Sequence, residues 1–117
     1  MSDDSLIRLR DALRAFAEER DWAQFHNPKN LAMALTGEVG ELVEHFQWLS
    51  AEQSAALDPA AREEVALEMA DVLLYLLRMA DTLDIDLVRA AEAKLEINAR
   101  RYPVELARGT SKKYDRL

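Results

Sequence analysis

The chain has 117 residues, of which 50% are hydrophobic and 32% are charged. This length and balance predict a single globular domain over residues 1–117 and argue against a disordered chain. The formal charge of −7 disfavours binding to duplex nucleic acid or to an anionic membrane surface, because an acidic surface repels phosphate groups. The absence of cysteine excludes disulfides, thiolate nucleophiles and cysteine-based metal sites.

The expected location and fold class follow from features that the sequence lacks. The first residues lack the apolar core of a signal peptide, and the longest nearly uncharged run, residues 72–77, is too short to cross a bilayer. We therefore expect a cytoplasmic protein with no membrane partner. Only three glycines and three prolines interrupt the chain, and no long stretch of β-branched residues occurs, so the composition predicts an all-α fold.

Four helices follow in chain order. The first covers residues 4–19, where apolar residues recur at steps of three and four. The second opens with a cap and a proline at residues 27–28 and is expected to reach about residue 49. The third opens in the same way at 58–59 and reaches about residue 83. The fourth begins near Asp84 or Asp86 and ends at Tyr102-Pro103, which leaves a polar tail over 104–117 that folds over the body or stays mobile.

The third predicted helix is apolar around more than one side. One stripe contains Val65, Val72, Leu76, Met79 and Leu83, and other sides contain Leu67, Leu73, Leu74 and Leu77. A helix of this kind requires apolar partners on several sides. A chain this short cannot supply all of them, so we expect a homo-oligomer.

Four acidic residues are placed to meet between the second and third helices. Glu38 lies about 60° around the axis from Leu35, at the border of the apolar stripe, and Glu41 follows one turn later. Glu68 and Asp71 repeat this spacing on the third helix. If the two helices are antiparallel neighbours, they direct four carboxylates into one volume.

Such a cluster is unfavourable without a cation, because like charges repel and partial burial increases the cost. A ligand set made only of oxygen atoms favours Mg²⁺ or Mn²⁺ over zinc. The alternative interpretation is two solvated acidic helix faces, since Glu-x-x-Glu is common on helix surfaces. A ferritin-like di-iron site is excluded, because neither His26 nor His45 has an acidic residue three positions before it.

Several motifs occur together and in order. They are GEVGEL at 37–42, FQW at 46–48, EMADVLLYL at 68–76, ERDW at 19–22, FHNPKNL at 25–31 and NARRYPV at 98–104. Over about residues 10 to 114, the chain resembles the all-α MazG-like nucleoside triphosphate pyrophosphohydrolases, and within them the small dCTP pyrophosphatases.

The resemblance implies a four-helix MazG-like protomer that forms a dimer or a dimer of dimers, with active sites near subunit interfaces. It implies Mg²⁺-dependent cleavage of a nucleoside triphosphate, either dCTP or a modified cytosine deoxynucleotide, to the monophosphate and pyrophosphate, in a pool-cleaning role. By this resemblance Glu38, Glu41, Glu68 and Asp71 are the Mg²⁺ ligands, and Glu38 or Glu41 takes the proton of the attacking water.

The resemblance also suggests where the base binds. Trp22 and Trp48 match base-stacking aromatic residues of the dCTP-cleaving relatives, with ordinary core or interface packing as the alternative. Tyr75 follows Asp71 by one turn and either packs under the base or belongs to the core. His26 and Asn30 match the family pattern and either bind substrate or brace the start of the second helix.

The fourth predicted helix and the tail carry candidate phosphate-binding groups. Lys94, Asn98 and Arg101 share one helix face at i, i+4 and i+7, where they can hold phosphates or form a solvated basic strip. Residues 112–114 of the tail either close over the substrate or stay mobile. We interpret His45 as a neighbour of the acidic site.

Two positions depart from the family pattern. Gly37 stands where many MazG-type enzymes place another glutamate, which leaves the number of cations, one or two, open. Leu13 stands where some dCTP-cleaving relatives carry a histidine at the base pocket, so the preference for cytosine is less firmly implied than hydrolysis. The competing hypothesis is a non-catalytic oligomeric helical module that binds a nucleotide or a protein.

Overall fold

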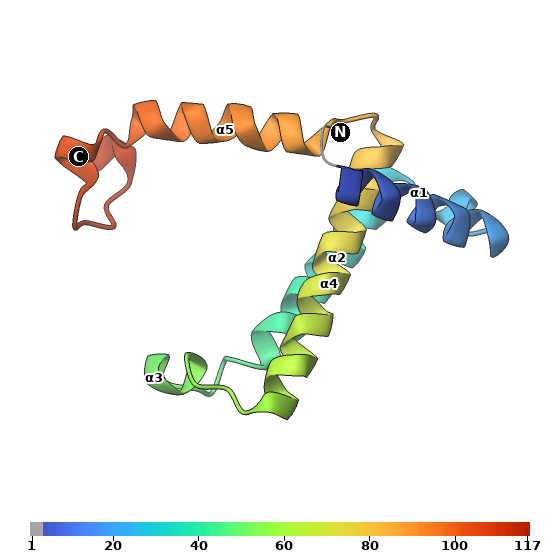
Figure 1. Ribbon diagram of the computed structural model, residues 1–117, viewed down its shortest axis with the longest axis horizontal. Coiled ribbons are helices and arrows are strands. Elements are labelled where there is room, and N and C mark those ends of the chain that lie inside the picture. The colour runs from blue at the N-terminus through green and yellow to red at the C-terminus, as the bar shows by residue number, and fades with distance from the viewer. Residues whose placement is uncertain (1–3) are drawn as a thin grey trace.

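The computed structural model describes residues 4–117, which form helices joined by short turns (Figure 1). The long helices are α1 (Asp4–Glu19), α2 (Pro28–Glu44), α4 (Pro59–Thr82) and α5 (Leu87–Arg101). The short ones are η1 (Ala23–Phe25), α3 (Ala51–Ser54), α6 (Val104–Ala107) and η2 (Tyr114–Arg116). No strand is present in this described range, and the predicted all-α class is confirmed. None of its helices is long and apolar enough to span a membrane.

Three helix starts lie where the capping residues predicted them. The side-chain oxygens of Asn27, Asp58 and Asp86 each accept a hydrogen bond from the backbone N–H three residues ahead, over 2.9 to 3.1 Å. Such bonds satisfy donors that have no partner inside the helix. Proline follows the cap in α2 and α4, where its missing N–H costs nothing.

The prediction that the second helix reaches Leu49 is wrong, because α2 ends at Glu44. Most backbone hydrogen bonds of residues 45–49 reach back three residues instead of four, so the chain turns there. Ser50 then starts α3 with a capping box, in which its hydroxyl and the Gln53 side chain each accept from the other residue's N–H. This second start signal, at Ser50, follows the turn that separates α2 from α3.

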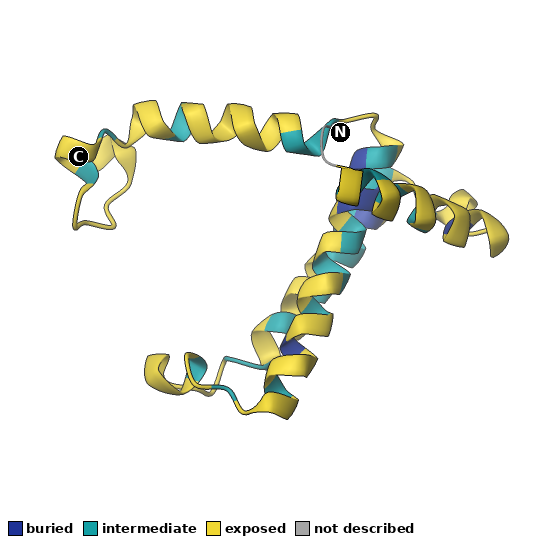
Figure 2. Cartoon of the chain, viewed as in Figure 1, coloured by how far each residue is buried: buried dark blue, intermediate teal, exposed yellow. Residues whose placement is uncertain are grey.

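The antiparallel pair α2 and α4 forms the most extensive helix contact, and α1 packs across the C-terminal part of α4 (Figure 1). The most deeply buried side chains gather where these three helices meet (Figure 2). Leu31 of α2, Leu77 of α4 and Ala17 of α1 are 2%, 0% and 1% exposed. This junction fixes the relative position of the three helices that carry the predicted site.

Helix α5 projects away from the other long helices, and the tail lies at its far end (Figure 1). The tail forms α6 and η2 and does not fold over the α2–α4 pair. Tyr114 packs edge-to-face on Tyr102 with ring centroids 6.2 Å apart, and the Arg101 guanidinium lies 4.7 Å from the Tyr114 ring centre. The tail is thus held on α5 by local aromatic contacts.

Candidate active site

Three of the four predicted acidic ligands meet between α2 and α4. Carboxylate oxygens of Glu38, Glu41 and Glu68 lie within 4.8 Å of one another. The i, i+3 spacing on α2 and the antiparallel packing against α4 produce this cluster. Asp71 is one turn beyond Glu68, close enough for its charge to act on both Glu38 and Glu68.

Partial burial and mutual repulsion disfavour the charged forms of the carboxylates in the acidic cluster. Burial, followed by the neighbouring Glu41 carboxylate, raises the pKa of Glu38. Burial and the same neighbour also raise the pKa of Glu68. One oxygen of each of these two glutamates, Oε2, is shielded from solvent and has no hydrogen-bond partner among the described residues. Two shielded acceptors without donors, next to a third carboxylate, fit a bound cation.

His45 borders the cluster, as predicted. Its Nε2 lies 3.8 Å from Glu68 Oε1, and its Nδ1 lies 4.0 Å from Glu64 Oε2. The imidazole therefore stands between an acid of the cluster and an acid one turn earlier on α4.

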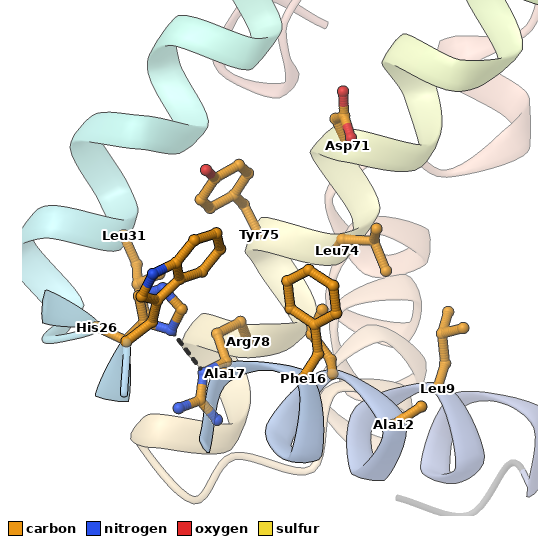
Figure 3. A pocket seen from close by; sticks show the side chains of 12 residues that line it. Leu9, Ala12, Phe16, Ala17, His26, Leu31, Asp71, Leu74, Tyr75 and Arg78 are labelled. Carbon is orange, nitrogen blue, oxygen red and sulfur yellow. Dashed lines mark hydrogen bonds between the residues drawn. The ribbon is translucent and has the colours of Figure 1, made fainter. Parts of the chain in front are cut away.

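A cavity of about 400 Å³ opens beside the acids, lined by α1, α2, α4 and the segment around η1 (Figure 3). Its volume is typical of small-molecule sites. Phe16, Trp22 and Tyr75 supply aromatic surface, and Asp71 lies on its lining. Asp71 therefore belongs both to this cavity and to the surroundings of the acidic cluster.

Trp22 is fixed at the cavity by neighbouring rings. It lies edge-to-face on Phe16 at a centroid distance of 5.7 Å and on His26 at 6.4 Å. The Arg20 guanidinium stacks on the Phe16 ring, 3.6 Å from the ring centre. Trp22 is still 44% exposed, so it retains surface on which a flat group can stack.

A buried polar chain supports the cavity from the side of α1. Arg78 lines the cavity and donates from Nε to His26 Nδ1 over 3.0 Å. Its Nη1 donates to Asp81 Oδ2 over 3.3 Å, and Asp81 also accepts two bonds from Arg14. Burial, and then the charge of Arg78, lower the pKa of His26.

Other predicted substrate-binding residues are absent from the cavity lining. Asn30 donates from its side chain to the Phe25 carbonyl over 3.1 Å, so it braces the start of α2. Trp48 is 87% exposed in the turn after α2. Lys94, Asn98 and Arg101 lie on α5, which runs away from the α2–α4 pair (Figure 1).

Arg78, Asp81 and Phe16 were not among the predicted site residues. Arg78 is only 8% exposed although it is charged, and it follows Asp71 by two helical turns. A basic residue within the apolar third helix, with an acid three positions later, was the available signal. Leu13, noted as a departure from the family pattern, does line the cavity.

The chain is similar to a known protein family and to relatives of named activity. Residues 34–117 match the model of the MazG-like family. The chain is 50% identical to dCTP pyrophosphatase 1 of Homo sapiens over 98% of its own length and 69% of the relative's. It is 46% identical to dCTP pyrophosphatase 1 of Bos taurus, covering 97% of its own length and 68% of the relative's.

A solved structure has the same fold. The crystal structure of a pyrophosphatase from Archaeoglobus fulgidus superposes with a TM-score of 0.81 and 39% sequence identity. The match covers 88% of this chain and 96% of the archaeal one. The α2–α4 pair that carries the acids therefore belongs to an architecture found in a pyrophosphatase.

Proposed function

Because this chain belongs to the MazG-like family, we propose that it hydrolyses a deoxynucleoside triphosphate to the monophosphate and pyrophosphate. We propose dCTP or a modified cytosine deoxynucleotide as substrate, since relatives named dCTP pyrophosphatase align over nearly the whole chain. The cellular role that follows is house-cleaning of the nucleotide pool in the cytoplasm.

One observation carries this proposal: the aromatic cavity lies beside the acidic cluster, and Asp71 lines the cavity and is close enough for its charge to act on Glu38 and Glu68. A nucleotide has a flat, partly apolar base at one end and a highly charged triphosphate at the other. Trp22 and Tyr75 offer stacking surface for the base. Glu38, Glu41 and Glu68 offer cation ligands for the triphosphate end.

We propose that Glu38, Glu41, Glu68 and Asp71 hold Mg²⁺, with Mn²⁺ as a substitute. The shielded, unpartnered oxygens of Glu38 and Glu68 and the all-oxygen donor set support this assignment. When bound, the cation supplies positive charge against the triphosphate oxygens and lowers the pKa of water. It also explains how an acidic protein accepts a polyanionic substrate.

We assign acceptance of the attacking water's proton to the carboxylate of Glu38 or Glu41.

We propose that the active assembly contains at least two copies of the chain. The radius of gyration is 17.6 Å, whereas a compact domain of this length has roughly 13 Å. The accessible surface is 9015 Å², whereas a folded monomer of this mass has roughly 6,500 Å². The excess includes large apolar side chains on α4 and α5, among them Leu67 at 64% and Leu95 at 69% exposure.

A second copy is also the source we propose for the remaining substrate contacts. Trp48, Lys94, Asn98 and Arg101 lie off the cavity of their own chain, on the exposed turn and the projecting helix. Their predicted roles, base stacking for Trp48 and phosphate binding for the other three, are retained as roles in a neighbouring copy's site.

The experiment measures product release from a panel of deoxynucleoside triphosphates, including 5-methyl-dCTP, with and without Mg²⁺. We expect dCTP to yield dCMP and pyrophosphate, separated by anion-exchange chromatography, and no dCDP. Glu38→Gln is expected to lower kcat by at least about 100-fold, because it removes a cation ligand and a candidate base. Glu44→Gln, an exposed position on the same helix, is the matched control and keeps full activity.

Two results would contradict the proposal. The first is equal turnover by wild type and Glu38→Gln, with unchanged helical circular dichroism. The second is thermal stabilisation by nucleotide without turnover and without any effect of Mg²⁺, which identifies the non-catalytic binding module instead.

A further inference from the structure

The cavity wall contains a polar chain that joins the protein surface to one side chain of the cavity. Arg14 of α1 donates two hydrogen bonds to Asp81 of α4, one from Nε to Oδ2 at 2.9 Å and one from Nη2 to Oδ1. Asp81 Oδ2 accepts from Arg78 Nη1 at 3.3 Å, and Arg78 Nε donates to His26 Nδ1 at 3.0 Å. Figure 3 shows the last of these bonds beneath the aromatic side chains.

The side chains of this hydrogen-bonded series are more buried on the side of the cavity. The Arg14 side chain is 45% exposed, whereas those of Asp81 and Arg78 are 10% and 9% exposed. A buried guanidinium is unfavourable unless it is paired, and Asp81 is its partner here. The hydrogen bond from Arg14 is the main reason that the pKa of Asp81 is lowered, which keeps this carboxylate charged.

The bond from Arg78 determines where the proton of His26 lies. A guanidinium donates hydrogen bonds and cannot accept them. His26 Nδ1 must therefore present a lone pair to Arg78 Nε, which excludes a proton on Nδ1. A neutral imidazole then carries its proton on Nε2. Burial and the charge of Arg78 lower the pKa of His26, in agreement with a neutral ring.

Nε2 is the ring atom left for a ligand. His26 lines the cavity, and the only hydrogen bond of its imidazole to the described residues is the one through Nδ1. The ring also lies edge-to-face on Trp22, at 6.4 Å between centroids, which restricts its rotation. A single N–H donor is thus held beside the stacking surface of the cavity.

We propose that Arg78, supported by Asp81 and Arg14, is a positioning residue that sets His26 as an Nε2–H donor for an acceptor atom on the base of the bound nucleotide. This inference rests on the proposed function. Cytosine offers two adjacent acceptors, the O2 carbonyl and the unprotonated N3, whereas thymine and uracil carry a proton at N3. His26 is the base-reading group, and the three charged residues behind it act through it.

The first test reads the His26 tautomer directly and needs no turnover. Long-range ¹H–¹⁵N NMR of the full chain at pH 7.5 resolves the two histidines, His26 and His45. We expect a protonated Nε2 and an unprotonated Nδ1 for His26 in wild type. Arg78→Met is expected to spread the proton over both nitrogens. A proton on Nδ1 in wild type overturns the proposal, as do unchanged nitrogen shifts in a folded Arg78→Met.

The second test measures binding of a non-hydrolysable dCTP analogue in the presence of Mg²⁺. His26→Leu is expected to raise Kd about three- to tenfold, the range for the loss of one hydrogen bond. His26→Gln places an amide N–H near the position of Nε2 and is expected to restore most of the affinity. Equal Kd for His26→Leu and wild type overturns base reading by His26.

A variant of Arg14, the exposed member of the hydrogen-bonded series, avoids the risk of unfolding that comes with replacing a buried residue. Arg14→Gln is expected to move the His26 nitrogen shifts in the same direction as Arg78→Met, by a smaller amount, because it loosens Asp81. Arg8→Gln, an exposed position on the same helix, is the matched control and leaves them unchanged. Unchanged His26 nitrogen shifts in Arg14→Gln would show that Arg14 does not support Arg78 and His26. Predicted tautomer shifts without any pyrophosphate release would instead count against the proposed hydrolysis.

Discussion

At the scale of single residues, the acidic cluster was predictable because its geometry is largely local. Glu38 and Glu41 share a helix face by spacing alone, and so do Glu68 and Asp71. Only the antiparallel pairing of α2 and α4 had to be assumed. The position of His45 beside the acidic cluster was predicted for the same reason, since it lies two turns after Glu38 in the same helical sector.

The polar support of the cavity was not predictable in this way. Arg78 and His26 are 52 positions apart, and Arg14 and Asp81 are 67 apart. Their contacts depend on how α1 crosses α4, which helical periodicity does not specify. The sequence alone left both roles of Asn30 open, and in the folded chain its side chain donates to a backbone carbonyl, which accounts for a bracing role at the start of α2.

Because the acids repel one another, we expect the acidic cluster to lower the stability of the metal-free protein at neutral pH. The pKa of Glu68 is raised in the folded state, so its contribution to stability is fully present below its unfolded pKa and is lost as the pH rises through the folded one. Glu68→Gln is therefore expected to raise the Tm of the metal-free protein at pH 7 and to change it little near pH 4.

Differential scanning fluorimetry in EDTA from pH 4 to pH 8 measures this effect. Glu63→Gln, exposed on the same helix, is the control and is expected to follow wild type. A Tm for Glu68→Gln at or below the wild-type value at pH 7 would show that the acids do not repel one another in the metal-free fold.

At the scale of helices, the starts at Pro28 and Pro59 and three of the four ends were predicted to within two residues, and the end of α2 was not. A start is specified by a capping side chain and a proline within three residues of sequence. The end of α2 was predicted five residues too late, because the apolar residues Phe46 and Leu49 continue the helical period although the backbone has already turned. The capping box that opens at Ser50 is the local signal for this break.

The cap of α4 is expected to affect stability measurably. The Asp58 side chain accepts from the Ala61 N–H over 2.9 Å at the start of the helix that carries Glu68 and Asp71. Asp58→Ala is expected to lower the free energy of unfolding by about 0.5–2 kcal/mol. Asp58→Asn retains an acceptor and serves as the matched variant, with a smaller loss. Urea denaturation followed by circular dichroism measures both, and equal losses would exclude capping as the cause.

At the scale of the whole molecule, the apolar surplus of the third predicted helix indicated a missing partner. The direction of α5 could not be predicted from its own sequence, because the helix has few contacts inside one chain. The extended shape and the exposed Leu67 and Leu95 are explained together if neighbouring copies cover these surfaces.

Light scattering coupled to gel filtration tests this assembly. Wild type is expected at two or more times the 13.3 kDa chain mass. The double variant Leu67→Glu/Leu95→Glu is expected to shift toward a single copy, because charges on a buried apolar interface are unfavourable. Glu96→Gln, next to Leu95, is the control. A wild-type protein that elutes at 13.3 kDa at micromolar concentration would rule out the assembly.

The central claim is that the carboxylates of α2 and α4 hold a divalent cation beside an aromatic base pocket. Anomalous diffraction from crystals soaked with Mn²⁺ and a non-hydrolysable dCTP analogue tests it most directly. We expect an anomalous peak among Glu38, Glu41, Glu68 and Asp71, with the triphosphate against it and the base beside Trp22. A peak elsewhere, or nucleotide density with these four side chains directed into solvent, would contradict the claim.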